Sequence, residues 1–366
     1  MHHVNSVGEA AWHGKYGEAG SVHISSPQDG GLGSLRLVTR PWPSVTVIVP
    51  TRPGQNSILA VDAAARLDYP TERLEILVVR GRQPACQRNA ALRQARGEFI
   101  YFLDDDAVAR PENLQRALPH FDRPEVQMVG GPNVCPADAP WLERVFAVVL
   151  GSWLAFGPSR ARYEPVGTLR DTSEKELILC NLLARRDAVL EAGGFDEALY
   201  PNEENALMDN LQKNGGRLVY DPDLVVERRP RPTLKAFARM LRTYGRGRAE
   251  QFRRTPTLGS LPNFAPPAFV LYLACLAAFS VWQPRWSGLA ALPLVLYVVA
   301  LACQWLASSA RHGPVRSAAA LPLVVLTHLL YGVGFWRGLF TRLSSEASGR
   351  AADVALETFK SLPDAE

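Results

Sequence analysis

Short apolar runs recur through the first part of the chain, separated by stretches of mixed polarity. They are rich in Val, Ile, Leu and Phe, which is typical of strands buried in a sheet. The predicted strands are residues 44–51, 74–79, 98–103 and 126–130, and the predicted helices are residues 57–67, 83–96 and 112–120. Because strand–helix–strand units join parallel strands by right-handed crossovers, this alternation predicts an α/β fold: a mostly parallel, Rossmann-like sheet with flanking helices.

The pattern becomes less regular beyond residue 130. Residues 176–185 form an apolar run that predicts one more strand, and residues 217–220 predict a short one. Helices are predicted at residues 186–192 and 203–214, and each stops at a pair of glycines, as helix C-termini often do.

Three long apolar segments follow, at residues 267–282, 288–306 and 318–336. Each is almost free of charge, is near the length that crosses a bilayer, and carries Trp or Tyr near an end. They predict a multi-pass membrane region of about three transmembrane helices. The alternative is a set of core helices buried in a soluble protein.

Charge sharpens this picture but leaves the topology open. The net charge is only +4, yet residues 228–254 hold ten Lys and Arg against one acid, Glu250. A basic stretch before the first span places the α/β domain in the cytoplasm. Three crossings would then put the tail outside, whereas Arg337, Arg342 and Arg350 favour the inside. Either one segment does not cross, or the tail breaks the rule.

These features divide the chain into five parts. They are a flexible arm at residues 1–43, an α/β domain at 44–227, a basic amphipathic or interfacial segment at 228–265, a membrane region at 266–340 and a tail at 341–366. The arm has no apolar core of a signal peptide. The five cysteines are odd in number and lack CxxC spacing, so we expect reduced thiols. No phosphate-binding GxxxxGK[ST] loop or nucleic-acid recognition motif occurs, which disfavours an ATPase or a nucleic-acid partner.

Three consecutive acids, Asp104, Asp105 and Asp106, stand where the third predicted strand ends. Carboxylates this close repel one another unless a cation lies among them, and carboxylate oxygens suit Mg²⁺ or Mn²⁺. The cluster therefore predicts a metal site at the C-terminal edge of the sheet, where nucleotide phosphates bind in such folds. A solvated acidic turn is the alternative.

The order of motifs around this cluster resembles the family 2 inverting glycosyltransferases of the GT-A fold. The resemblance covers residues 44–223 and is carried by the following short sequences: VTVIVPT (45–51), QRNAAL (87–92), ARGEFI (95–100), FLDDD (102–106), GGFDE (193–197) and NEENAL (202–207). It is similar in particular to bacterial inner-membrane members that build succinoglycan and related exopolysaccharides, through YGRGR (244–248) and the apolar C-terminal region.

The resemblance implies a donor side and a metal. Asp104 and Asp106 would be the Asp-x-Asp pair that holds Mg²⁺ or Mn²⁺ against the donor diphosphate, with Asp105 between them. The remaining donor-binding residues that it implies are Pro50, Thr51, Arg52, Arg80, Arg88 and Asn89. One departure concerns the nucleotide base: the family's Asp after the second strand is missing, so we expect Arg80, Arg82 or Gln83 to take its place.

It also implies a base and an acceptor loop. Inversion requires a base that deprotonates the acceptor hydroxyl, and the family pattern points to Glu204, with Glu203 as the alternative. Simple N-terminal helix charge is the competing explanation of this pair. The loop that contains Gly194, Phe195 and Asp196 would shape the acceptor site.

Arginines at residues 239–248 allow two interpretations. Arg246 and Arg248 would bind the donor diphosphate if the family element is retained, because guanidinium groups bind phosphate oxygens bidentately. A basic amphipathic helix on anionic lipid headgroups explains the same residues.

As a whole, the resemblance implies an enzyme of the hexosyltransferase type. It would move one sugar from a UDP- or GDP-sugar to a lipid-linked saccharide or polyprenyl phosphate in polysaccharide or glycoconjugate biosynthesis. It would sit in the bacterial inner membrane with the active site facing the cytoplasm. The alternative, motivated by the missing Asp, is a degenerate glycosyltransferase domain that acts as a membrane scaffold.

Overall fold

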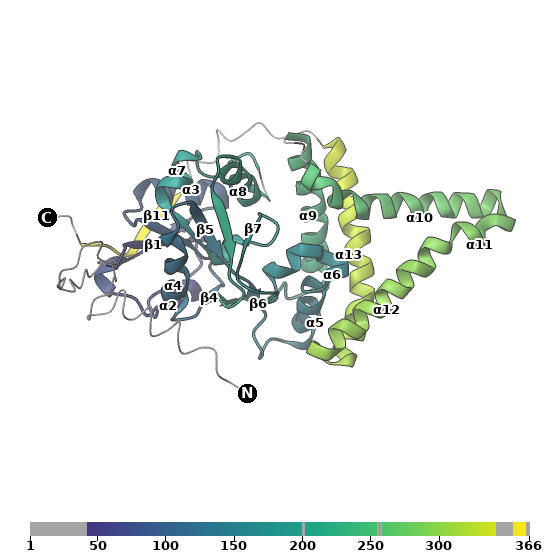
Figure 1. Ribbon diagram of the computed structural model, residues 1–366, viewed down its shortest axis with the longest axis horizontal. Helices are drawn as coiled ribbons and strands as arrows, with labels where there is room; N and C mark the ends of the chain where they lie inside the picture. The colour runs from purple at the N-terminus through teal and green to yellow at the C-terminus, as the bar shows by residue number, and fades with distance from the viewer. Residues whose placement is uncertain (1–41, 200–201, 255, 257, 342–353, 364–366) are drawn as a thin grey trace, which may run out of the picture.

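The computed structural model describes residues 42–199, 202–254, 256, 258–341 and 354–363. Nearly all of the predicted N-terminal arm, together with Arg342 and Arg350, therefore lies outside the described residues. The described chain forms an α/β domain from which a helical region projects (Figure 1).

A mixed sheet forms the centre of the α/β domain. Its order is β11-β2-β1-β3-β8-β5-β9-β7. The strands are β1 (Val45–Thr51), β2 (Leu74–Arg80), β3 (Phe99–Phe102), β5 (Val126–Gly130), β7 (Arg170–Thr172), β8 (Leu182–Arg185), β9 (Arg217–Tyr220) and β11 (Ala355–Lys360). The strands β1, β2, β3, β5 and β9 share one direction, whereas β7, β8 and β11 run against it. The predicted α/β fold with a mostly parallel sheet is confirmed.

A small second sheet lies beside the first, in the order β4-β10-β6. Its strands are β4 (Val108–Ala109), β6 (Asn133–Val134) and β10 (Val226–Glu227). It fixes the segment that leaves the domain at Arg228 close to the turn that follows β3.

Helices cover both faces of the large sheet, because alternate residues of its buried strands point to opposite sides. In β1, Val45, Val47 and Val49 belong to the core under α2 (Leu59–Ala64) and α4 (Asn113–Ala117), while Ile48 belongs to the core on the other face. That second core is closed by α3 (Pro84–Gln94), α7 (Arg186–Glu191) and α8 (Glu203–Lys213). Short 3-10 turns occur at η1 (Thr71–Arg73), η2 (Leu118–Asp122), η3 (Gly157–Arg162) and η4 (Leu179–Asn181).

The predicted strand at residues 176–185 is wrong over most of its length. Only β8 is extended, and η4 precedes it. The reason is Asn181, whose fully buried side chain accepts a bond from the Tyr101 hydroxyl at 2.8 Å and donates to the Leu224 carbonyl at 2.6 Å. The chain must turn to aim that amide inward. The strand also inserts between β3 and β5, antiparallel to both.

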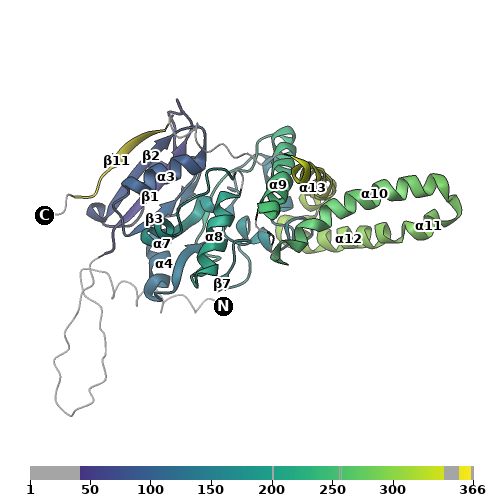
Figure 2. The same cartoon turned by 90° about the horizontal axis from the view of Figure 1, so that it is seen from above.

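The tail contains a strand that the sequence did not predict. Strand β11 pairs with β2 in antiparallel register, Ala355 opposite Arg80 and Thr358 opposite Leu77. It forms the sheet edge on the side remote from the projecting helices (Figure 2). The Arg80 Nε donates to Glu357 Oε1 at 2.7 Å, which ties the two strands together further.

The three long apolar helices predicted from the sequence are present in the projecting region. Helix α10 (Ala265–Trp282), the tip segments η6 (Pro284–Trp286) and α11 (Ser287–Ala290), and helix α12 (Leu292–His312) form a hairpin that stands away from the domain (Figures 1 and 2). Helix α13 (Pro314–Phe340) instead lies along α9 (Leu234–Arg254). Smaller elements in this region are α5 (Trp141–Leu150), α6 (Trp153–Phe156) and η5 (Leu258–Phe264).

Glycines allow α9 and α13 to touch backbone to backbone. A Cβ at Gly334 would lie 2.2 Å from the Arg242 carbonyl oxygen, and one at Gly338 would lie 2.4 Å from that of Arg246. A Cβ at Gly245 would lie 2.0 Å from the Tyr331 carbonyl oxygen. The order of these contacts shows that the two helices run in the same direction.

Candidate active site

The three acids lie where the sequence places them, just past the end of β3. The Leu103 amide donates to the Ile48 carbonyl at 3.2 Å, which carries the chain beside β1 up to Asp104. The neighbouring strand β1 ends at Thr51, whose hydroxyl donates to Asp105 Oδ2 at 3.3 Å. Thr51 and the acid cluster therefore share the C-terminal edge of the sheet.

Arg228 joins the two outer acids of the cluster. Its Nη1 lies 3.0 Å from Asp104 Oδ2, and its Nε donates to Asp106 Oδ1 at 2.6 Å. Burial opposes ionisation of Asp104, yet Arg228 and Arg88 outweigh it and hold the pKa of this carboxyl below its usual value. For Asp105, burial and repulsion from its two neighbours raise the pKa.

Arg88 links this cluster to the predicted base region. The buried guanidinium donates to Asp104 Oδ1 at 2.9 Å and to Glu203 Oε1 at 3.3 Å. It comes from the middle of α3, whose N-terminus is capped by Gln83 through a bond from the Cys86 amide at 3.0 Å. A single arginine therefore joins the predicted donor side to the predicted base region.

Glu203 and Glu204 open helix α8 but differ in their surroundings. Glu203 is 4% exposed, and its Oε2 accepts from the Asn202 amide at 3.1 Å, where Asn202 has a φ of 122°. Burial and repulsion from Glu204 raise the pKa of Glu203 to about 7. Glu204 is only half-buried, with the Asn205 side-chain amide 3.5 Å from its Oε1.

The loop with Gly194, Phe195 and Asp196 is clasped by Asn89. The Asn89 Nδ2 donates to the Phe195 carbonyl at 2.8 Å, and its Oδ1 accepts from the Phe195 amide at 2.9 Å. A Cβ at Gly194 would lie 2.6 Å from that same oxygen, and the residue has a φ of +72°, so a side chain would be strained there. Asp196 lies 3.4 Å from Arg254, at the end of α9.

The Asn89 side chain therefore faces the predicted acceptor loop, although the resemblance assigns it to the donor. Its donor role stays a prediction.

Arg246 and Arg248 of α9 contact residues of their own helix. Arg246 lies 3.4 Å from Glu250, and Arg248 donates to Gln251 at 3.1 Å. Arg248 is nonetheless near the predicted base region, since both it and Glu204 act on Arg162. Burial and Arg248 lower the pKa of Arg162, and Glu204 raises it. Arg162 donates to Asn205 Oδ1 at 2.6 Å. Their predicted contact with a diphosphate stays a prediction.

Arg80, one of the three residues that we expected at the nucleotide base, is held by the tail. Arg80 donates through Nε to Glu357 on β11 and through Nη1 to the Gln55 carbonyl at 2.8 Å. Gln83 donates to the Glu197 carbonyl. Pro50 lies in buried β1, and Arg52 is exposed just beyond it. These four residues lie at or just beyond the C-terminal ends of β1 and β2, and their contact with a nucleotide stays a prediction.

Asp104 and Asp106 could hold a divalent cation only if a bound ligand supplies further oxygen atoms. Within the described part of the chain, no group of three His, Cys, Asp or Glu side chains is arranged to hold a metal ion. Asp104 and Asp106 do converge on one cationic group, Arg228. Two carboxylates plus substrate phosphates are a usual Mg²⁺ ligand set, so the residues suit a metal that arrives with a diphosphate.

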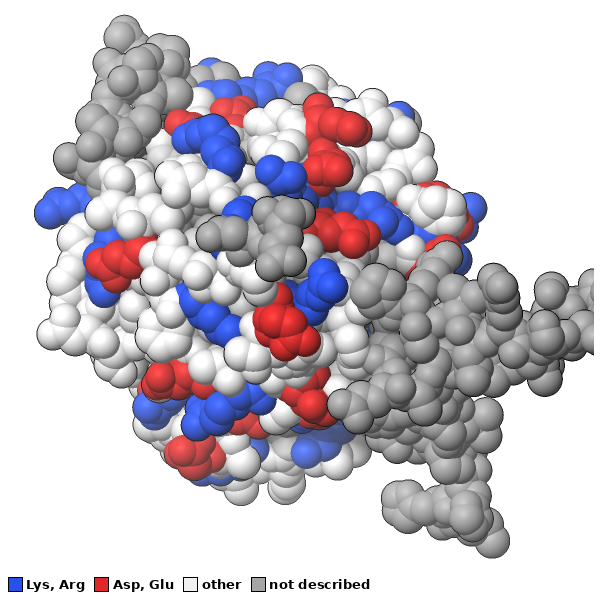
Figure 3. All heavy atoms as spheres, turned by 90° about the vertical axis from the view of Figure 1, so that its left-hand side faces the viewer, with Lys and Arg blue, Asp and Glu red and all other residues white. Residues whose placement is uncertain are grey.

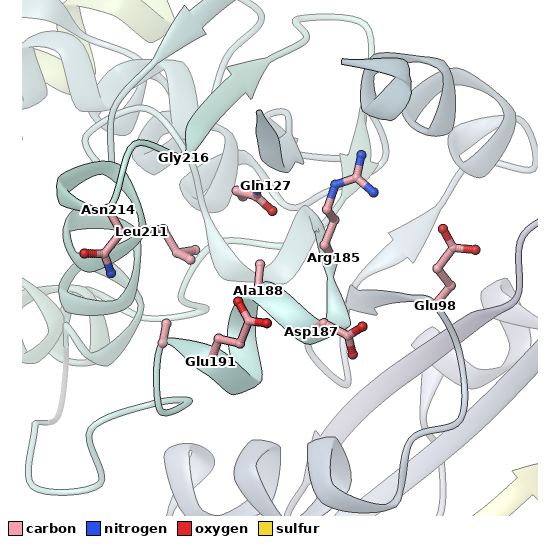
Figure 4. Close-up of a pocket in the computed structure, with 10 residues that line it drawn as sticks. Glu98, Gln127, Arg185, Asp187, Ala188, Glu191, Leu211, Asn214 and Gly216 are labelled. Atoms are coloured by element: carbon pink, nitrogen blue, oxygen red, sulfur yellow. The ribbon is translucent and has the colours of Figure 1, made fainter. Parts of the chain in front are cut away.

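Two cavities differ in their relation to this site. A cavity of about 390 Å³ lies at the opposite end of the strands, between Glu98, Arg185 and Gly216 (Figure 4). A smaller one, about 60 Å³, adjoins the acid cluster through Arg228. Its lining joins Arg229 and Arg231 to apolar and aromatic residues of α5 and α9 and their surroundings: Ala147, Leu150, Tyr163, Met240 and Tyr244.

The sequence predicted most residues of this site but not Arg228. Asp104, Asp106, Arg88 and Glu203 form one network of ion pairs, and Glu204 lies beside it. Arg228 had been counted only as part of a basic stretch. The sequence signal that could have found it is the run Arg228-Arg229-Pro230-Arg231 directly after a short apolar segment.

Comparison with known proteins gives a consistent family. The family described as "Glycosyl transferase family group 2" matches residues 99–336, more than half of the chain. The pre-mycofactocin glycosyltransferase of Mycobacterium tuberculosis is 29% identical over 184 residues, covering 47% of this chain and 36% of the relative. The succinoglycan biosynthesis protein ExoA of Rhizobium meliloti is 28% identical over 204 residues, covering 54% and 56%. The matches thus span about a third to just over half of these relatives.

Two solved structures contain chains that are partly similar to this one. The mannosyltransferase PcManGT from Pyrobaculum calidifontis, in complex with GDP-Man and Mn²⁺, has a TM-score of 0.47 at 20% identity, covering 81% of this chain and 87% of that chain. A fragment of S. aureus TarS in complex with UDP has a TM-score of 0.39 at 16% identity, covering 81% and 90%.

Proposed function

The chain belongs to glycosyl transferase family group 2, and we propose that it moves a sugar from a nucleotide-sugar donor to a membrane-linked acceptor, with inversion at the anomeric carbon. The observation that carries this proposal is the ion-pair network in which Arg228 joins Asp106 to Asp104 and Arg88 joins Asp104 to Glu203, the neighbour of Glu204. It supplies, within one site, groups for a diphosphate and a base for an acceptor.

The donor diphosphate is proposed to lie at the C-terminal edge of β1 and β3. Asp104 and Asp106 would hold Mg²⁺ or Mn²⁺ there, and this ion would neutralise charge on the leaving diphosphate. Arg88 adds fixed positive charge in a buried site, where it needs no reorganisation during the reaction. Arg52, Arg80 and Gln83 are proposed to contact the nucleoside.

Glu204 is proposed as the base. Its carboxylate takes the proton of the acceptor hydroxyl while the acceptor oxygen bonds to the anomeric carbon and the bond from that carbon to the diphosphate oxygen breaks. Glu204 is more accessible than Glu203, which is buried against Arg88. Glu203 is the positioning residue in this scheme, because it ties the start of α8 to Arg88 and through it to Asp104.

The acceptor is proposed to be lipid-linked, either a saccharide on a lipid carrier or polyprenyl phosphate itself. The small cavity beside Arg228 supports this, because it combines three arginines with apolar side chains near the apolar helices. Arginines suit phosphate, and the apolar lining suits a lipid chain. The enzyme would lie in the bacterial inner membrane, with basic α9 and the active site on the cytoplasmic side.

The test is a thermal-shift screen of the full-length protein in detergent. UDP, GDP, CDP and dTDP are each added with and without Mn²⁺, to wild type, to Asp104→Asn and to the surface control Asp62→Asn. We expect one nucleotide to raise the unfolding midpoint in the presence of Mn²⁺, in wild type and Asp62→Asn but not in Asp104→Asn. The stabilising nucleotide then defines the donor for a radiolabelled-sugar transfer assay with lipid extracts.

A membrane scaffold is the second candidate, and two observations favour it. The acids of the cluster are already paired by Arg228 and Arg88, and the family's base-contacting Asp is missing. A scaffold predicts no shift by any of the four nucleotides at millimolar concentration, which would overturn the transferase proposal.

A further inference from the structure

The three apolar helices differ in how they are covered. In the most apolar windows of the first two candidate spans, Gly259–Trp282 and Pro284–His312, only 6% and 0% of residues are buried by the protein. In Pro314–Phe340 the share is 39%. The first two therefore present apolar side chains all round, as lipid-embedded helices do, whereas α13 is packed along the α/β domain side of the molecule.

We propose that the chain crosses the bilayer twice, through the α10–α12 hairpin, and that α13 lies in the headgroup plane on the same side as the α/β domain. This inference rests on the proposed membrane location and deepens it: it fixes the number of crossings, the side of the C-terminus and the surface that meets lipid.

The hairpin has the dimensions of two crossings. Helix α10 has 18 residues and α12 has 21, so they are about 27 and 32 Å long at 1.5 Å per residue, near the thickness of a bilayer's hydrocarbon core. Between them the chain turns through Trp282, Arg285 and Trp286, and both tryptophans are well exposed. Aromatic and basic residues at a turn of this kind favour the far membrane–water interface.

Helix α13 is kept out of the hydrocarbon by its partner. The glycine contacts hold α9 against α13 in parallel, so that α9 lies wherever α13 lies. On α9, the basic residues Lys235, Arg239, Arg242 and Arg253 are exposed. Each charged side chain in the hydrocarbon core is costly, so these four residues together oppose a crossing.

In the headgroup plane, the same pair of helices is well placed. The exposed arginines and lysine can meet lipid phosphates, and the exposed Val315, Val333 and Phe340 of α13 can enter the acyl boundary. His328 of α13 donates through Nε2 to the Leu154 carbonyl of α6 at 2.9 Å, and its Nδ1 lies 2.7 Å from the Tyr297 hydroxyl of α12. It therefore ties α13 to both α6 and α12.

The tail gives an independent argument for an even number of crossings. Strand β11 pairs with β2 inside the α/β domain, so residue 355 and residue 80 occupy the same compartment. With three crossings, the bilayer would separate them. The last turn of α13 is likewise tied to α9, since Arg253 donates to the Gly338 carbonyl at 3.1 Å. The exposed Arg337 at the end of α13 then lies inside, as the charge rule requires.

The test is cysteine labelling in sealed right-side-out membrane vesicles with a membrane-impermeant maleimide. The full-length protein carries serine or alanine at its five native cysteines and one new cysteine: Gly288→Cys at the hairpin tip, Val315→Cys at the start of α13, or Phe359→Cys on β11. We expect Gly288→Cys to react in sealed vesicles, and the other two to react only after detergent opens the membrane.

Each other pattern overturns the inference. Labelling of Phe359→Cys in sealed vesicles would show three crossings and break the β11–β2 pairing. No labelling of Gly288→Cys until the membrane is opened would mean that the hairpin does not cross, and this leaves sugar transfer itself untouched. Loss of nucleotide binding, by contrast, would refute the proposed function without altering the labelling pattern.

A second measurement does not depend on cysteine variants. The wild-type chain is fused at its C-terminus either to green fluorescent protein, which becomes fluorescent in the cytoplasm, or to alkaline phosphatase, which is active only outside it. We expect fluorescence without phosphatase activity. The reverse result would overturn the proposal.

Discussion

At the scale of single residues, the site is a chain of alternating charges. Glu203, Arg88, Asp104, Arg228 and Asp106 follow one another through ion pairs of 2.6–3.3 Å. Removing one partner of a buried pair leaves the other without compensation, which costs several kcal/mol. A donor that binds here with its own cation and phosphates, as proposed, would rearrange this network, and Arg228 would have to leave the two acids.

Arg228 and Mn²⁺ are expected to compete for the same two carboxylates. Replacement by Gln in Arg228→Gln should lower the unfolding midpoint without metal. It should tighten Mn²⁺ binding by about tenfold or more, because a hydrogen bond to a charged group contributes about 1.5–3 kcal/mol. Mn²⁺ titration by electron paramagnetic resonance measures this. Arg229→Gln is the control, since Arg229 pairs with Glu143 instead. Weaker Mn²⁺ binding in Arg228→Gln would mean that Arg228 supports the metal.

Glu204→Gln should abolish most turnover while leaving the donor bound. General-base catalysis contributes about 10²–10⁴-fold, so a loss of that size in kcat is expected. The nucleotide-induced thermal shift should be unchanged, because Glu204 makes no contact with the acid cluster among the described interactions. Should Glu204→Gln retain its rate while Glu203→Gln loses it, Glu203 would be the base.

The raised pKa of Glu203 gives stability a defined pH dependence. In the folded protein burial and Glu204 raise this pKa to about 7, whereas the unfolded value is 4.5. Between these pH values the folded state keeps a proton that the unfolded chain releases, so this contribution to stability is present near pH 4.5 and is lost as pH rises through 7. In thermal unfolding, wild type should fall relative to Glu203→Gln over this window. A constant difference would contradict the raised pKa.

The sequence predicted the acids, Arg88 and the glutamate pair because each lies in a short motif next to a regular element. It could not predict Arg228, whose partners are more than 120 residues away along the chain. Nor could it show that Asn89 clasps the Gly194–Phe195 loop, since that contact depends on how α3 packs beside α7 and α8.

At the scale of elements, apolar runs located most of the sheet. Strands β1, β2, β3, β5 and β9 were predicted within about a residue or two, because each is mostly buried on both faces and so is mostly apolar. The strand predicted at residues 176–185 was wrong over most of its length because a buried polar residue, Asn181, bends the chain there. Strand β11 escaped prediction because it is mostly exposed at an edge and its partner is far away in sequence.

The α9–α13 contact should tolerate no side chain at Gly334. In Gly334→Ala the new Cβ meets backbone at 2.2 Å, so the helices must separate, and overpacking of this kind costs about 1–3 kcal/mol. Gly288→Ala is the matched control, because nothing lies within 4 Å of its Cβ position. A helical Ala is favoured over Gly there by about 1 kcal/mol. The unfolding midpoint should fall in the first variant and not in the second. Equal midpoints would contradict the close contact.

At the scale of the whole molecule, the two ends of the long axis differ. The face of the α/β domain remote from the helices carries interspersed basic and acidic side chains (Figure 3), whereas the projecting hairpin is apolar. The acid cluster lies between them. Arg228, which pairs with Asp106, also lines the small cavity beside α5 and α9. An acceptor held in the bilayer would meet this site at the membrane surface.

If the enzyme is anchored in the membrane, sugar transfer should be fastest when the enzyme and its acceptor lie in the same bilayer. We expect radiolabelled sugar to reach a lipid-linked acceptor when enzyme and acceptor occupy the same vesicles, and to slow by about tenfold or more when they occupy separate vesicles. The reason is effective concentration: a common bilayer confines both partners to a thin layer. Equal rates in the two arrangements would contradict a membrane-bound reaction.

The pairing of β11 with β2 also has a consequence for how the protein is made. The ribosome finishes β2 about 280 residues before β11, which at about 5–20 residues per second leaves its edge uncovered for roughly a quarter of a minute to a minute. During that time the edge of β2 exposes unpaired backbone groups that invite aggregation. If the hairpin crosses the bilayer twice, as proposed, β11 can close this edge only after the chain has inserted and returned to the side of the α/β domain.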